Sequence, residues 1–109
     1  MGLFGQTVTV YRADGSRRVI PACALQRKHG YFTDEQGTRL RDRFTLIVPG
    51  AWDLRPGDRL LEGVGPDRVD WAAFLPETVE GVCQIGYVQP FFWAGRVTHV
   101  EAGGQYDRY

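Results

Sequence analysis

Fourteen glycines and six prolines divide the 109-residue chain into short segments, and this spacing most constrains the fold. Turn signals come about every ten residues, a spacing typical of small β-sandwiches and β-barrels. These closely spaced turn signals leave no room for long helices. The sequence therefore predicts one all-β domain over residues 1–104, a small barrel or sandwich of about six strands with one long polar loop at residues 26–43.

Six segments have the β-branched, aromatic or alternating residues of strands: 7–11, 18–25, 44–48, 60–64, 82–88 and 96–101. Ala13-Asp14-Gly15-Ser16 predicts a hairpin between the first two. Arg55-Pro56-Gly57-Asp58 fits a type II turn, because proline fixes φ and the following glycine accepts a positive φ. Residues 70–75 suit either one helical turn or an irregular connector, and we expect residues 105–109 to fray.

The charge balance and the cysteines indicate which partners and which cellular compartment to expect for the chain. Thirteen Lys and Arg balance thirteen Asp and Glu, so no overall field favours a polyanion or an acidic membrane surface. Cys23 and Cys83 lie in apolar segments without an export signal, which predicts two buried free thiols. No stretch approaches the ~20 apolar residues of a membrane span. We expect no membrane association and no secretion by a signal peptide.

Catalytic and metal-binding motifs are absent from the sequence. The two histidines, His29 and His99, have no partner at metal-ligand spacing, and the only serine, Ser16, falls in a predicted turn. An enzyme would need Asp34 and Glu35 to converge with both histidines on one cleft. We therefore expect a protein that is not an enzyme and binds no cofactor.

The predicted loop at residues 26–43 alternates positive charge with aromatic rings. This pattern suits a groove for single-stranded nucleic acid, but nearby carboxylates leave the segment a net charge of only +2, which favours a flap that docks protein. Its candidate partner-binding residues are Arg27, Lys28, Tyr31, Phe32, Arg39 and Arg41.

A second candidate contact is the run Phe91, Phe92 and Trp93, bounded by proline and glycine. Consecutive side chains of a strand point to opposite faces, so at least one ring would be exposed unless a partner covers it. The alternative is a bend that buries all three rings at the mouth of a barrel.

The order of these features resembles a family of minor capsid and head–tail joining proteins from tailed phages and prophages of Gram-positive bacteria. The resemblance lies in Val8-Thr9-Val10-Tyr11, the apolar strand from Phe44 to Pro49, the Pro-Gly-Asp turn and short strand within residues 54–63, and His99-Val100-Glu101-Ala102-Gly103. The chain departs from the family pattern at Val100, where the family has tryptophan.

This resemblance implies a β-barrel that forms a ring beneath the portal, as a head-closure (stopper) or adaptor protein connecting portal and tail. The implied partners are other copies of the chain and neighbouring portal and tail proteins, and the resemblance also allows contact between an extended loop and packaged DNA. The expected location is the virion, after synthesis in the host cytoplasm. The alternative is a small OB- or SH3-like barrel that binds single-stranded nucleic acid.

Overall fold

The computed structural model describes residues 5–34 and 37–108, and the side chains of residues 5–28 and 43–104. Seven antiparallel strands form one curled sheet in the order β5-β4-β1-β2-β3-β7-β6. The strands are β1 (Gln6–Tyr11), β2 (Arg17–Asp34), β3 (Gly37–Pro49), β4 (Arg59–Glu62), β5 (Cys83–Gln84), β6 (Tyr87–Trp93) and β7 (Arg96–Arg108). The described residues include no helix, which confirms the predicted all-β class.

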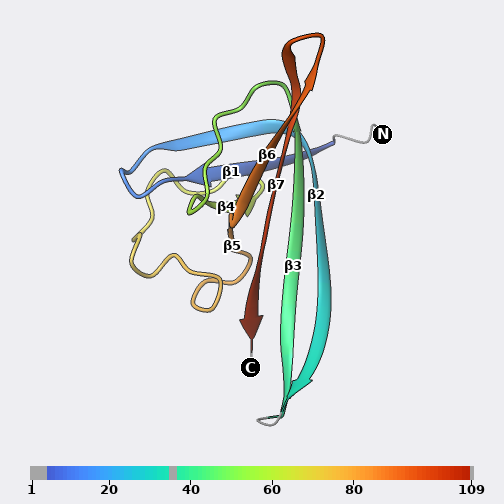
Figure 1. Cartoon of the computed structure of the whole chain (residues 1–109). Helices are drawn as coiled ribbons and strands as arrows, with labels where there is room; N and C mark the ends of the chain where they lie inside the picture. The colour runs from blue at the N-terminus through green and yellow to red at the C-terminus, as the bar shows by residue number, and fades with distance from the viewer. Residues whose placement is uncertain (1–4, 35–36, 109) are drawn as a thin grey trace.

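Strand β2 gives the sheet its curl because it changes partner along its length. Residues 17–23 pair with β1, and residues 24–34 pair with β3. The β1–β2 register shifts between Gln6 and Val8, opposite a stretch of β2 that contains Pro21, and the Thr7 hydroxyl donates to the Pro21 carbonyl at 3.2 Å. Proline is tolerated in a strand at such a bulge, where the strand also bends. The bend of β2 in Figure 1 turns the sheet from one direction to the other.

Strand β1 is buried on both faces, and the neighbouring β4 is buried at Leu60 and partly buried at Leu61. Val8, Val10 and Leu60 belong to the main core inside the curled sheet, whereas Tyr11 packs edge-on against Phe74 on the outer face, with ring centroids 5.0 Å apart. The segment 64–82 covers this outer face. Within it, residues 70–75 form consecutive turns and not a helix, with Ala73 N donating to the Asp70 carbonyl at 3.0 Å.

The segment 26–43 is not the irregular loop that the sequence predicted. Its two halves, residues 26–34 and 37–43, continue β2 and β3 as a paired ribbon, which we call the arm. The pairing runs from Ala24 opposite Ile47 to Asp34 opposite Gly37. The arm projects from one end of the sheet (Figure 1). Its polar sequence lacks the apolar alternation that marks a half-buried strand, so its structure follows from the register set by the apolar pairs at its base.

Two further expectations differ from the structure. Residues 105–108, expected to fray, continue β7 beside β3, with Arg108 opposite Leu40. The predicted strand 82–88 is divided, because the chain leaves β5 at Ile85 and Gly86 and enters β6 on the other edge of the sheet.

Other local predictions are confirmed. Gly57 has φ +94°, and Asp58 N donates to the Arg55 carbonyl at 3.0 Å, as the type II turn requires. Cys23 and Cys83 are buried and not joined in a disulfide. In the part of the chain that the structure describes, no helix is long and apolar enough to cross a membrane.

Candidate functional site

The hairpin of β6 and β7 ends in an exposed cluster of aromatic side chains. Phe91, Phe92 and Trp93 have 39%, 66% and 78% of their surface exposed, and we call these three residues the aromatic tip. The turn residues Ala94 and Gly95 have φ of 52° and 79°, and two consecutive positive φ values are typical of a tight hairpin turn. The hairpin projects beyond the sheet at the end opposite the arm (Figure 1). None of the three rings is buried, so the predicted alternative of a bend that hides them is wrong.

A bulge below the tip fixes the direction of the hairpin. Phe91 lies opposite His99 and Phe92 lies opposite Val97, so Thr98 is an extra residue on β7. Its hydroxyl donates to the Phe91 carbonyl at 3.2 Å, and its own carbonyl accepts from Gly50 N at 2.9 Å. Bulges bend a strand and redirect its side chains. The bond from Gly50 N joins this bulge to the end of β3, so the base of the tip is held by hydrogen bonds.

Phe91 also packs against β7 below the tip. Its ring stacks on the His99 imidazole, with centroids 4.5 Å apart and planes inclined by 10°. This contact leaves Phe92 and Trp93 as the rings with the most free surface. The exposed apolar area of the tip is therefore concentrated at its outer end, where a partner can reach it.

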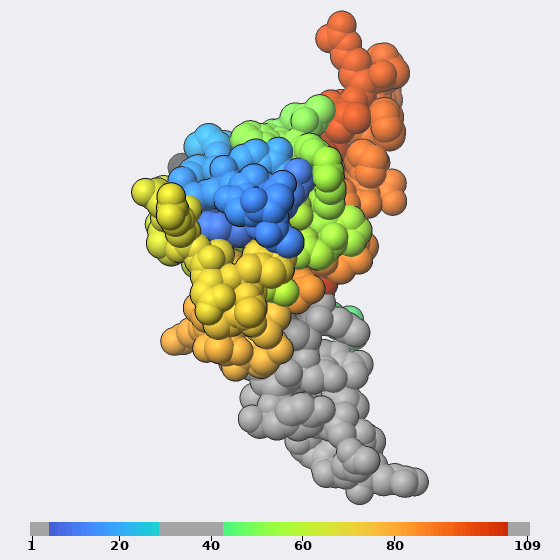
Figure 2. Space-filling view, turned by 90° about the vertical axis from the view of Figure 1, so that its left-hand side faces the viewer, coloured from blue at the N-terminus to red at the C-terminus, as the bar shows by residue number. Residues whose placement is uncertain are grey.

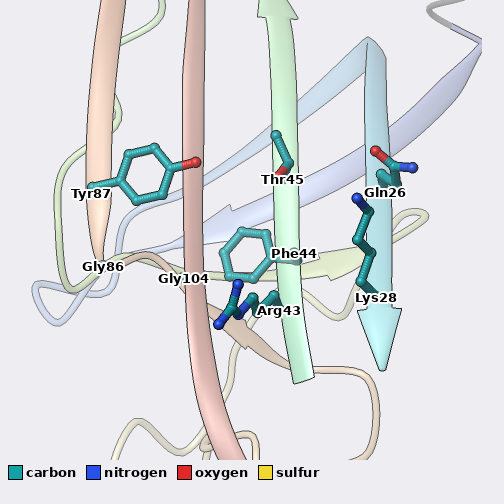
Figure 3. Close-up of a pocket in the computed structure, with 8 residues that line it drawn as sticks. All are labelled: Gln26, Lys28, Arg43, Phe44, Thr45, Gly86, Tyr87 and Gly104. Carbon is teal, nitrogen blue, oxygen red and sulfur yellow. The ribbon is translucent and has the colours of Figure 1, made fainter. Parts of the chain in front are cut away.

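A groove of about 600 Å³ lies at the base of the arm (Figure 3). Strands β2, β3, β6 and β7 meet there. We call it the arm-base groove, and its lining residues are Gln26, Lys28, Arg43, Phe44, Thr45, Gly86, Tyr87 and Gly104.

Glycines on β7 hollow out the groove. A Cβ atom on Gly103 would come within 2.6 Å of the Tyr87 hydroxyl oxygen and 2.8 Å of the Phe44 carbonyl oxygen. The Tyr87 ring therefore lies over the bare backbone of β7, and its hydroxyl donates to Glu101 Oε2 at 3.2 Å. Burial, followed by the nearby charge of Glu101, raises the pKa of Tyr87 above its usual value, so the phenol stays a neutral donor at physiological pH.

Two cations form the opposite wall of the groove. Lys28 on β2 and Arg43 on β3 are directly opposite each other in the register, and both are exposed. Like charges at paired positions repel. The ion pairs among the described side chains include neither residue, so an anionic ligand or partner would relieve this repulsion.

The structure separates the residues that the sequence singled out. Lys28 lines the groove, whereas the neighbouring Arg27 lies on the other face of the ribbon and donates from Nη2 to the Gly81 carbonyl at 3.2 Å. The aromatic tip is at the far end of the molecule from the arm. The side chains of Tyr31, Phe32, Arg39 and Arg41 lie outside the described residues, and only their backbone positions in β2 and β3 are known.

Sequence reasoning missed the groove itself. Gln26, Arg43 and Thr45 belong to the segments already noted, but Tyr87 comes from another part of the chain and meets them only through the order of the strands. The adjacent Gly103 and Gly104 were a usable signal, since glycine inside a strand often marks a close approach of two backbones. Among the described side chains, no three potential metal ligands of the His, Cys, Asp and Glu types gather in one place.

Comparisons with models of protein families, with curated proteins and with solved structures find no match to this chain.

Proposed function

We propose that the chain is a structural subunit that works by assembling with other protein subunits and has no catalytic role. The observation that carries this proposal is the aromatic tip, where Phe92 and Trp93 stand 66% and 78% exposed on a braced hairpin. Aromatic side chains are enriched at protein interfaces and dominate their energetics. Burying two such rings against a partner stabilises a complex by on the order of several kcal/mol, before the free-energy costs of association are subtracted.

The assembly that we propose is the head–tail junction of a tailed phage. Copies of the chain would form a ring that connects portal and tail, in a head-closure or adaptor role, and the virion would be its location. Support comes from the resemblance in the order of sequence features, together with a small all-β fold that carries two projections at opposite ends. In this proposal the tip and the arm contact different neighbours.

The alternative function is binding of single-stranded nucleic acid through the arm. The observation in its favour is the pair Lys28 and Arg43 at the base of the arm, which could contact phosphates. Against it, the segment 27–43 has a net charge of only +2, which gives weak electrostatic attraction for a chain of phosphates.

Sedimentation of the full chain with the proteins encoded beside its gene tests the proposal. The double variant Phe92→Ser with Trp93→Ser should remain folded and lose co-sedimentation. Val64→Ser is the matched control, because Val64 is 71% exposed but lies away from the tip. The proposal fails if the double variant co-sediments like wild type, or if wild type ignores these proteins and binds single-stranded DNA tightly at physiological salt.

A further inference from the structure

The outer rings of the aromatic tip cannot reach the arm-base groove of their own copy. Phe92 and Trp93 keep 66% and 78% of their surface free. Along the extended strand β6 they stand roughly 17–20 Å from Tyr87, which lines the groove. In Figure 2 the hairpin that carries them stands clear of the body of the molecule. A cover for these two rings therefore has to come from a second molecule.

The arm-base groove offers surfaces that suit aromatic rings. Its lining includes the rings of Phe44 and Tyr87, and Gly86 and Gly104 add backbone without side chains (Figure 3). Glycine within a strand is typical of a site where another group approaches the backbone closely. The groove volume of about 600 Å³ lies within the range of pockets that enclose ligands larger than one ring. The groove therefore has room for both outer rings of a tip.

The two cations of the groove suit the same occupant. Lys28 and Arg43 are exposed, and the ion pairs among the described side chains include neither of them. A cation is attracted to the face of an aromatic ring, and most strongly to that of tryptophan. The nearby carboxylate of Glu101 already accepts from the Tyr87 hydroxyl and would repel an anionic partner. An uncharged aromatic group therefore fits this groove better than a carboxylate does.

We infer that the aromatic tip of one copy inserts Phe92 and Trp93 into the arm-base groove of a second copy. Every copy carries both halves of this contact and can join them only with another copy. Two different surfaces meet, so each copy contacts one neighbour through its tip and another through its groove. Heterologous contacts of this kind build rings where the rotation closes. The inference rests on the proposed function, because it specifies how copies of the subunit meet.

The size of the tip indicates which assembly the contact can stabilise. With the stated exposures, Phe92 and Trp93 offer roughly 200–350 Å² for burial, whereas a standard interface takes ~800 Å² from each partner. A single contact is therefore too small to hold a stable dimer. In a closed ring every copy makes two such contacts, and the last contact forms within one assembly, which strengthens the whole.

Sedimentation velocity of the full chain at increasing concentration tests the contact. Wild type should pass from monomer to a closed oligomer without accumulating dimer. The oligomer should persist at about 0.5 M salt, because salt screens exposed charges and does not weaken the burial of rings. The tip variant Phe92→Ser with Trp93→Ser should stay monomeric. The groove variant Lys28→Gln with Arg43→Gln should associate about tenfold more weakly, since it removes two cation–π contacts.

Cross-linking through introduced cysteines shows which surfaces meet. Ala94→Cys places a thiol at the turn of the tip, and Thr45→Cys places one in the groove, whereas the native Cys23 and Cys83 are buried. Under a mild oxidant, a mixture of the two variants should form a disulfide-linked dimer that neither variant forms alone. Val64→Cys in place of Thr45→Cys is the matched control, because Val64 is 71% exposed and does not line the groove.

A second control separates the groove from the rest of the ribbon. Arg27→Gln removes a cation that donates to the Gly81 carbonyl on the opposite face, and it should assemble like wild type. The inference is overturned if wild type stays monomeric up to its solubility limit, if the tip variant assembles, or if Ala94→Cys is cross-linked as readily to Val64→Cys as to Thr45→Cys. Binding of single-stranded DNA that the groove variant loses while it still assembles like wild type would instead assign the groove to nucleic acid.

The two proposals fail in distinguishable ways. If the neighbouring proteins co-sediment with wild type through the tip while wild type alone stays monomeric, the proposed function stands and the contact between tip and groove is wrong. If wild type binds neither itself nor the neighbouring proteins, the proposed function is wrong as well.

Discussion

The Nε atom of Arg12 lies 3.2 Å from both carboxylate oxygens of Asp58, so a single guanidinium joins the end of β1 to the turn before β4. Asp58 is 5% exposed, and its Oδ2 also accepts from Arg55 N at 3.0 Å. One buried carboxylate thus closes the type II turn and pairs with a cation from a different strand. Both contacts act beside β5, since the Asp58 carbonyl accepts from Ile85 N at 2.8 Å.

Asp58→Ala should destabilise the fold by about 2 kcal/mol, since the largely buried Arg12 keeps only its longer ion pair with Asp53, at 3.4 Å, and the Arg55 N–H loses its acceptor. Urea denaturation monitored by circular dichroism measures this loss. Asp67→Ala is the control, because Asp67 is 96% exposed and its ion pair with Arg17 spans 3.9 Å. Its free energy of unfolding should change by no more than about 0.5 kcal/mol. Equal effects of the two substitutions would contradict the role assigned to Asp58.

The neighbouring Asp53 should contribute to loss of stability in acid. A hydrogen bond from Arg55, with further contributions from Arg12, lowers the pKa of Asp53 below its ordinary value of 3.8. Because the folded pKa is the lower one, the stabilisation is fully present above the ordinary value and is lost as pH falls through the folded pKa. The free energy of unfolding should therefore decline below about pH 4, and Asp53→Asn should make that decline shallower.

The same measurement can be repeated with Arg55→Gln, which removes the first donor to Asp53 and should flatten the acid limb in the same direction. A pH profile that neither substitution alters would mean that other carboxylates dominate the acid response.

Gly57→Val should destabilise the fold by roughly 1–3 kcal/mol, because a β-branched residue is strained at φ +94°. No atom lies within 4 Å of a Cβ placed on Gly57, so the cost comes from the backbone and not from crowding. Gly57→Asn is the matched control, since asparagine tolerates a positive φ. Chemical denaturation of both variants is the measurement, and an equal loss in the two would point to a cause other than φ.

The parts of the fold that could be predicted are those that a short stretch of sequence determines. Thr7-Val8-Thr9-Val10-Tyr11 alternates and forms β1, and Pro56-Gly57 forms the expected turn. The arm could not be predicted in this way, because a ribbon whose sequence is polar on both sides has no apolar alternation to reveal it. Its pairing follows from the buried pair Leu25 and Leu46 at its base, a contact across the sheet.

The same distinction holds for the candidate site. The exposure of Phe92 and Trp93 could be predicted from three consecutive rings, since they cannot all face one core. The groove required the order of the strands, because β6 reaches Lys28 and Arg43 only across β7. Gly103 and Gly104 resemble a loose end in the sequence, yet both lie within β7, and Gly103 is buried.

Gly104→Ala should destabilise the fold by about 1–3 kcal/mol, the usual cost of forcing extra atoms into a closely packed site. A Cβ on Gly104 would clash with the carbonyl oxygen of Gln84 and would lie 3.1 Å from both Gly86 N and Phe44 Cε1. The first two atoms are backbone at the crossing from β5 to β6, and Gly86 N already donates to the Gly103 carbonyl at 2.7 Å, so this backbone cannot shift without losing that bond.

Gly86→Ala is the matched control on the other side of the same crossing, since its Cβ would meet nothing closer than 3.6 Å. In thermal and urea unfolding, Gly104→Ala should therefore be clearly less stable than wild type, and Gly86→Ala should be about as stable as wild type. The reverse order of stability would show that the close approach of β7 to this crossing does not hold the sheet in its curled form.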